Sequence, residues 1–112
     1  MPQNIINHAD LLKFICKAKP QQRLALIKTA DKKLIHCICE CTHNILNGNI
    51  PLTSAQKLKL AKHKKVLRKL TKRGENFIKK KRVLIQKGGS ILPLILAPLI
   101  SGVFSSLFRT NN

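Results

Sequence analysis

The chain has 112 residues, which is enough for one small domain and leaves no room for a second. Lys and Arg number 22 against 4 Asp and Glu, so the formal net charge is +18. Because self-repulsion at that charge opposes a compact fold, we expect a polyanionic partner, either a nucleic acid or an anionic membrane surface.

Residues 1–52 are predicted to form a helical amino-terminal part. Asn7 can cap a first helix over about 8–18, and Pro20 can occupy the first position of a short second helix ending near Lys28. The side chains expected to face inward from these two helices are Leu11, Leu12, Phe14, Ile15, Leu24 and Ile27.

A third helix is predicted over about 32–46, with Asp31 as its N-cap and Asn47-Gly48 at its end. The apolar positions in it repeat with the helical period of 3.6 residues. This inward stripe contains Leu34, Ile35, Ile38, Cys41, Thr42, Ile45 and Leu46.

Residues 53–87 are predicted to be a basic helical segment. Thr53 and Gln56 have the spacing of a capping box before a helix over about 54–70, and a weaker helix follows over about 77–86. The positions expected to face inward are Leu60, His63, Val66, Leu67, Leu70, Phe77, Ile78, Leu84 and Ile85.

Together these patterns predict an all-α fold: a small bundle of four to five short helices with an apolar C-terminal tail. The divisions are residues 1–52, residues 53–87, and a Gly-Gly joint with a hydrophobic tail over residues 88–112. The helices before the joint offer a small core, so we expect marginal stability without a partner.

Four cysteines, at 16, 37, 39 and 41, are too closely spaced to suggest a disulfide framework. Residues 1–9 lack the apolar stretch of a signal peptide, so reduced thiols in the cytosol or nucleus are expected. His36 to His43 resembles a metal-binding sequence, but on a helix its thiols and imidazoles diverge and cannot converge tetrahedrally on zinc. We predict buried structural thiols, with Cys37 and Cys39 flanking the stripe, and no metal or other cofactor.

No enzymatic activity is predicted. The four acidic residues are scattered, and the sequence contains no phosphate-binding glycine loop, nucleophile elbow or paired carboxylates at a usable spacing. We therefore assign no catalytic residue.

The basic residues are concentrated between positions 57 and 87, which hold 14 of the 22 and one acid, Glu75. Neutralising a phosphate backbone needs many cations at loose spacing and no base-reading geometry. The absence of Trp and Tyr argues against base stacking on aromatic side chains. The residues predicted to contact phosphates are Lys57, Lys62, Lys64, Lys65, Arg68, Lys69, Lys72, Arg73, Lys79, Lys80, Lys81 and Arg82.

After Gly88-Gly89 the sequence changes character, because residues 90–108 carry no charge. This length is just sufficient to span a bilayer as a helix, although Pro93 and Pro98 interrupt it. If the tail anchors or perturbs a membrane, the residues predicted to contact lipid are Ile91, Leu92, Leu94, Ile95, Leu96, Leu99, Ile100, Phe104 and Phe108.

Residues 87–100, KGGSILPLILAPLI, resemble the carboxy-terminal part of the adenovirus core protein X family, the precursors of the mu peptide. Three further stretches resemble proteins of adintoviruses and Polinton (Maverick) elements, which are adenovirus-like mobile elements: residues 45–52, 62–70 and 79–82. The resemblance implies a virion core protein that binds and compacts double-stranded DNA, located in the virion and the host nucleus, with capsid proteins as further partners.

The resemblance also implies processing by a viral cysteine protease at Gly88, Gly89 and Ser90. That protease cuts after Gly-Gly when an aliphatic residue stands two positions before the pair, and here Gln86 occupies that position. Two other functions remain open: a basic protein held on an intracellular membrane by its tail, and a helical module that binds another protein. The sequence does not distinguish DNA from RNA.

Overall fold

The computed structural model describes residues 3–74, 76–87 and 89–100, and within these ranges the chain is helical with no strand. The all-α prediction is therefore confirmed, but the helices are more numerous than the four to five predicted. They are α1 (Gln3–Asn7), α2 (Ala9–Lys17), α3 (Pro20–Lys28), α4 (Lys32–Leu46), α5 (Ser54–Ala61), α6 (Lys64–Thr71), α7 (Phe77–Gln86) and α8 (Ile91–Pro98).

Helix α4 begins and ends as its sequence predicts. The Asp31 carboxylate accepts a hydrogen bond of 2.9 Å from the Leu34 backbone N–H, which satisfies one of the unpaired donors of the first turn. After its last residue, Gly48 takes the left-handed conformation with φ of +75°. Of the predicted stripe, Leu46 alone is exposed, and Thr42 is buried with its hydroxyl donating to the Ile38 carbonyl oxygen over 2.9 Å.

The first predicted helix is interrupted at His8, which separates α1 from α2. Asn7 is the last residue of α1 and does not act as the cap of the following helix. The interruption allows Ile5 of α1 to be fully buried together with Leu12 of α2.

Two further side chains that we expected to face inward lie in solvent, in addition to Leu46. Phe14 of α2 is 55% exposed and Ile78 of α7 is 54% exposed. Burial of Leu12 and Ile15 fixes the rotation of α2, which turns Phe14 away from the core.

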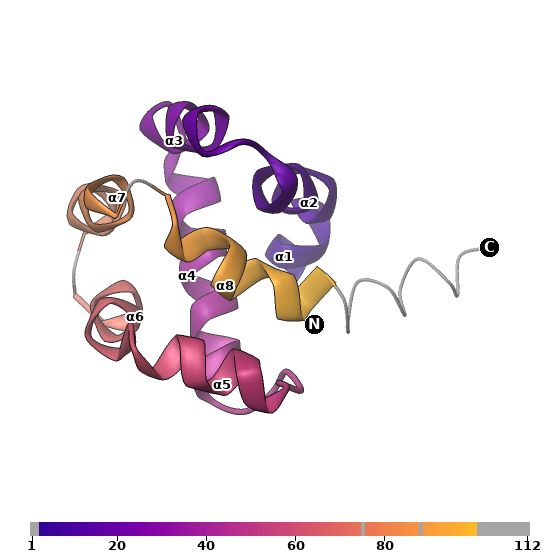
Figure 1. Ribbon diagram of the computed structural model, residues 1–112. Coiled ribbons are helices and arrows are strands. Elements are labelled where there is room, and N and C mark those ends of the chain that lie inside the picture. The colour runs from indigo at the N-terminus through magenta and orange to yellow at the C-terminus, as the bar shows by residue number, and fades with distance from the viewer. Residues whose placement is uncertain (1–2, 75, 88, 101–112) are drawn as a thin grey trace.

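The predicted helix over 54–70 is also two helices, α5 and α6, separated at Lys62 and His63. The capping box at its start is present, since Thr53 and Gln56 exchange hydrogen bonds of 2.9 and 3.1 Å. A single straight helix over residues 54–70 would be about 25 Å long and would follow the core in only one direction. The break instead turns α5 onto α8 and α6 onto α4 and α7 (Figure 1).

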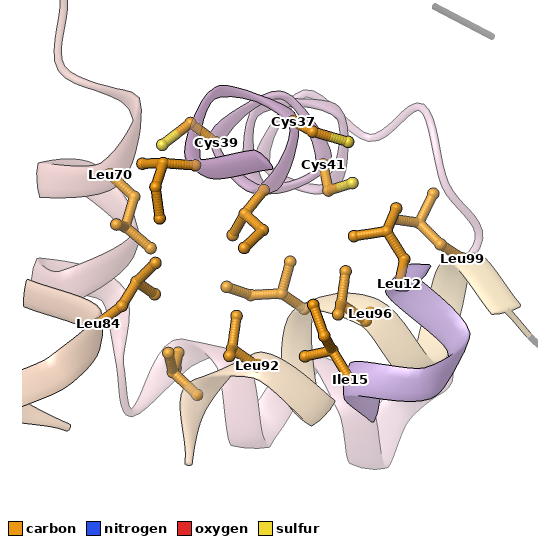
Figure 2. Packing of buried hydrophobic residues seen from close by; sticks show 14 of the residues in the cluster. Leu12, Ile15, Cys37, Cys39, Cys41, Leu70, Leu84, Leu92, Leu96 and Leu99 are labelled. Atoms are coloured by element: carbon orange, nitrogen blue, oxygen red, sulfur yellow. The ribbon is translucent and has the colours of Figure 1, made fainter. Parts of the chain in front are cut away.

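Helix α8 lies across the middle of the molecule, in contact with α2, α4 and α5 (Figure 1). Figure 2 shows its leucines directed into an interior shared with side chains of α2, α4, α6 and α7. Pro93 lies in its first turn, where a missing N–H costs little. The buried residues of this segment are Ile91, Leu92, Ile95, Leu96 and Leu99.

The position of α8 corrects our expectation of a separable tail, because residues 91–100 form part of the core. Burying a large aliphatic side chain contributes roughly 1.5–3 kcal/mol, so the five buried residues contribute an amount comparable to the whole stability of a small domain. The remainder of the predicted tail, residues 101–112, lies outside the described residues.

Candidate nucleic-acid interface

Helix α6 separates its apolar and basic residues onto opposite sides. Leu67 and Leu70 are buried against α4 and α7, which fixes the rotation of the helix. The side chains on the other side are therefore held in solvent. The exposed cations of α6 and of the turn after it are Lys64, Lys65, Arg68, Lys69, Lys72 and Arg73.

Helix α5, which precedes α6 in the chain, adds further cations to this basic surface. Its single buried residue, Leu60, packs with the core, and α5 contacts α8. Lys57, Lys59 and Lys62 are exposed around it. Lys59 was not among the sequence-predicted phosphate contacts, although its position among the other lysines could have identified it.

The four consecutive cations of helix α7, at positions 79–82, differ in their exposure and contacts. Lys79 and Arg82 are exposed, whereas Lys80 and Lys81 are half-buried. Lys81 Nζ donates a hydrogen bond of 3.0 Å to the Ala30 carbonyl oxygen, which lies between α3 and α4. This bond connects α7 to the link between α3 and α4, and it leaves two further N–H donors on the Lys81 ammonium group.

The cations at the junction of α6 and α7 surround a pocket of about 220 Å³. It is lined by Lys69, Lys72, Lys79, Lys80 and Val83. A second hollow of about 430 Å³ includes Lys72, Arg73 and Lys80 on one side and residues of α4 on the other. The sequence-predicted cations of α6 and α7 are thus brought together.

The acidic side chains within the described part of the chain lie outside α5, α6 and α7. Asp31 caps α4, and Asp10 lies in the first turn of α2, where a negative charge is favourable. Glu40 accepts hydrogen bonds from Asn4 and from His36, at 3.4 and 3.0 Å. Glu75, between α6 and α7 in sequence, is not among the described residues.

The thiols of α4 are buried, including Cys37 and Cys39, which we expected only to flank the stripe. Burial raises the pKa of Cys39 to about 11. A side-chain hydrogen bond between Cys41 and Cys37, together with burial, raises the pKa of Cys41. His36 and His43 are exposed. Among the residues that can be described, no group of three His, Cys, Asp or Glu side chains is placed to hold a metal ion.

The predicted processing site is partly described, since Gly89 and Ser90 are placed and Gly88 is not. Gly89 is buried and its N–H donates to the Leu84 carbonyl oxygen over 3.1 Å. The Ser90 N–H donates to the Lys87 carbonyl oxygen over 3.1 Å. Gly89 and Ser90 thus lie in a hydrogen-bonded turn that leads directly into α8.

The residues predicted to contact lipid are placed in the interior or partly buried where they are described. Leu94 and Ile100 are partly buried, and the other members between 91 and 99 are fully buried. Phe104 and Phe108 lie outside the described residues. No helix within the described ranges is both long enough and apolar enough to cross a bilayer.

Comparisons with protein-family models, with curated proteins and with solved structures give no match to this chain.

Proposed function

We propose that this protein binds double-stranded DNA without sequence preference and condenses it, as a non-enzymatic core protein of a virus-like mobile element. The observation that carries the proposal is the exposed basic surface of α5, α6 and α7. Buried leucines fix the orientation of these helices, so the cations are presented to solvent on an ordered body.

Such a surface suits a phosphate backbone. The α5, α6 and α7 helices carry two, four and four Lys and Arg side chains, respectively, and no acidic residue, so the cations on these helices far outnumber nearby carboxylates. Lysine acts as a compact point charge toward phosphate and tolerates many geometries, which favours binding that is independent of sequence. Condensation follows when neutralised DNA segments no longer repel one another.

The remaining elements of the proposal come from the resemblance to adenovirus core protein X and to Polinton proteins. It supports a location in the virion and the host nucleus, with capsid proteins as partners. Cleavage after Gly89 by a viral cysteine protease remains part of the proposal. Because Gly89 and Ser90 donate hydrogen bonds within the fold, we infer that the protease acts on the chain before it folds or while this turn is transiently open.

The proposal is tested with the full chain and two duplexes of unrelated sequence but equal length. Fluorescence anisotropy should give affinities that agree within about threefold, since phosphate contacts carry no sequence information. Light scattering on long DNA should show compaction as added protein charge approaches the phosphate charge. Strong preference for one duplex, or binding without compaction, would contradict the proposal.

A further inference from the structure

The outer side of helix α5 carries a short row of apolar side chains. Leu58 is 69% exposed, more than any other large hydrophobic side chain in the described part of the chain. Ala55 and Ala61, three positions before and after it, are also exposed, and this spacing places them on the same side of the helix. We call Ala55, Leu58 and Ala61 the α5 ridge.

The fold holds the α5 ridge in solvent. Leu60 is the buried residue of α5 and belongs to the core, on the side where α5 contacts α8. Residues two positions apart on an α-helix differ in direction by about 200°, so the core contact of Leu60 directs Leu58 away from the protein. The Leu58 side chain therefore remains in water unless a partner covers it.

Lysines border the ridge on both sides. Lys57 and Lys59 lie about 100° to either side of Leu58 around the helix, and Lys62 lies about one turn beyond it. All three are exposed, and α5 has no acidic residue. A partner that covers the ridge must therefore present negative charge on both sides of a strip that admits an apolar side chain.

We propose that the α5 ridge enters the minor groove of DNA, with Leu58 inserted between two base pairs so that the duplex bends. This inference rests on the proposed function, because it requires DNA as the partner. The two sugar-phosphate strands that border the groove match the lysines on each side of the ridge. Leucine is also one of the apolar side chains with which minor-groove proteins separate neighbouring base pairs.

The two alanines allow the helix to approach the base edges closely. The minor groove of B-DNA is about 6 Å wide, whereas a helix with its side chains is about 10–12 Å across. Methyl side chains at Ala55 and Ala61 reduce the width of α5 on either side of Leu58. Insertion must still open the groove, which bends the duplex toward the major groove by about 20–90°. A bend in the DNA is therefore the direct consequence of the inference.

An anionic bilayer is the alternative cover for an apolar ridge between lysines. A helix that lies in a bilayer interface buries a broad apolar face. The α5 ridge offers one large side chain and two methyl groups, which is a narrow contact for a membrane. A single leucine is sufficient to separate one base step, so the dimensions of the ridge favour DNA.

The experiment uses the full chain and an end-labelled duplex of about 30 bp, a length over which such bends are measurable. Fluorescence energy transfer reports the end-to-end distance, and anisotropy on the same samples reports affinity. Saturating wild-type protein should shorten the distance. Leu58→Ala should abolish most of the shortening and weaken affinity by less than about tenfold, because the lysines remain. Leu58→Met keeps a long apolar side chain and should bend the duplex as the wild type does.

Two controls separate insertion of Leu58 from a general loss of apolar surface. Leu46→Ala removes the same atoms from an exposed leucine at the end of α4 and should leave the bend unchanged. Netropsin, which fills the minor groove of A·T-rich DNA, should suppress the bend when it is bound before the protein is added.

The inference is overturned if the wild-type chain binds the duplex without bending it, or if Leu58→Ala bends it as strongly as the wild type. It is also overturned if Leu46→Ala reduces the bend equally, or if netropsin has no effect on it. In these cases the anisotropy still shows DNA binding, so the proposed function stands.

Two other results have different meanings. Anisotropy that shows no binding to the duplex contradicts the proposed function, and the inference falls with it. If Leu58→Ala releases the protein from phosphatidylserine vesicles and leaves the DNA bend intact, the ridge serves a bilayer, which overturns the inference alone.

Discussion

The side chain of Arg23 lies directly against the backbone of Gly89. A Cβ at position 89 would lie 3.3 Å from both Cγ and Cδ of Arg23, which is closer than ordinary van der Waals contact. The guanidinium group beyond that stem donates to the carbonyl oxygens of Ile15, Cys16 and Ala18, at 3.0, 3.3 and 2.7 Å. Arg23 of α3 thus supplies hydrogen-bond donors to the backbone carbonyl groups at the end of α2, and its stem also packs against Gly89 just before α8.

This contact predicts a difference between two glycine substitutions. Gly48 and Gly89 have φ of +75° and +76°, so replacement by Ala imposes the same backbone strain of about 1–2 kcal/mol at both. Nothing lies within 4 Å of an added Cβ at Gly48, whereas at Gly89 the Arg23 stem must move. Gly89→Ala should therefore lower the free energy of unfolding more than Gly48→Ala, as measured by urea denaturation. Equal losses would mean that the contact contributes nothing.

Arg23 itself should be hard to replace. Arg23→Met keeps most of the apolar stem but leaves three carbonyl oxygens at the end of α2 without these donors, and we expect a decrease of about 2–4 kcal/mol in unfolding free energy. Lys28→Met, on the exposed side of the same helix, is the control and should change stability by less than about 0.5 kcal/mol. Urea denaturation measures both, and similar small effects would show that the buried arginine is dispensable.

The position of α8 predicts that the chain cannot fold without it. A protein ending at Gly89 lacks the five buried residues of this segment and should show no cooperative thermal unfolding and little helix by circular dichroism. In the full chain, Leu96→Ala should cost about 2–5 kcal/mol, whereas Leu58→Ala, at a position 69% exposed, should have little effect. A stable, cooperatively folded protein of residues 1–89 would contradict the central role of α8.

The buried thiols predict slow alkylation and a specific pH dependence. Burial raises the pKa of Cys39 to about 11 from its ordinary value of 9.0, so the folded state retains a proton that the unfolded state loses. The stability contributed by this group is fully present below about pH 9 and is lost as the pH rises through 11. At about pH 9, where half of an unperturbed thiol is ionised, iodoacetamide should modify Cys39 far more slowly in the folded protein than in urea. Equal rates would show that the thiol is accessible.

Replacing Cys37 or Cys41 with Ser should lower the free energy of unfolding by different amounts, because the two thiols have different surroundings. Cys41→Ser and Cys37→Ser both place a hydroxyl in the core, but the Cys37 thiol already donates to the Asn4 carbonyl oxygen over 3.7 Å, and a serine hydroxyl can reuse that acceptor. We therefore expect the larger decrease in unfolding free energy for Cys41→Ser. Urea denaturation of both variants tests the ranking, which the reverse order would refute.

The parts of the fold that the sequence predicts well are those with local signals. Asp31, Gly48 and the Thr53–Gln56 pair specify helix ends through bonds to their own neighbours, and the α4 stripe follows one period. The break between α5 and α6 has no glycine or proline to indicate it. It accompanies a difference in tertiary packing, since α5 contacts α8 whereas α6 contacts α4 and α7.

The sequence of residues 90–108 does not indicate what surrounds it, because an uncharged stretch has no polar face that would mark its solvent-exposed side. A helix that is apolar all round fits either a bilayer or a protein interior, and the choice depends on whether other helices enclose it. Arg23 and Lys81 were similarly beyond sequence reasoning, because their acceptors are backbone carbonyl oxygens brought close only by folding. The pocket of α6 and α7 depends on the same tertiary packing.

The most direct test of DNA binding by the α5–α7 surface is the dependence of affinity on salt. If roughly six to ten phosphates are engaged, affinity for duplex DNA should fall on the order of 10³- to 10⁵-fold between 50 and 200 mM salt. Replacing Lys64, Lys65 and Arg68 with Gln should make the slope shallower by about 0.9 for each phosphate that is no longer neutralised.

The matched control removes equal charge from another part of the surface. Lys17 and Lys28 are exposed on α2 and α3, and Lys19 is exposed in the link between them. Replacing these three with Gln should leave the slope nearly unchanged. Affinity that is flat across this salt range, or equal slopes for the two triple variants, would contradict the account.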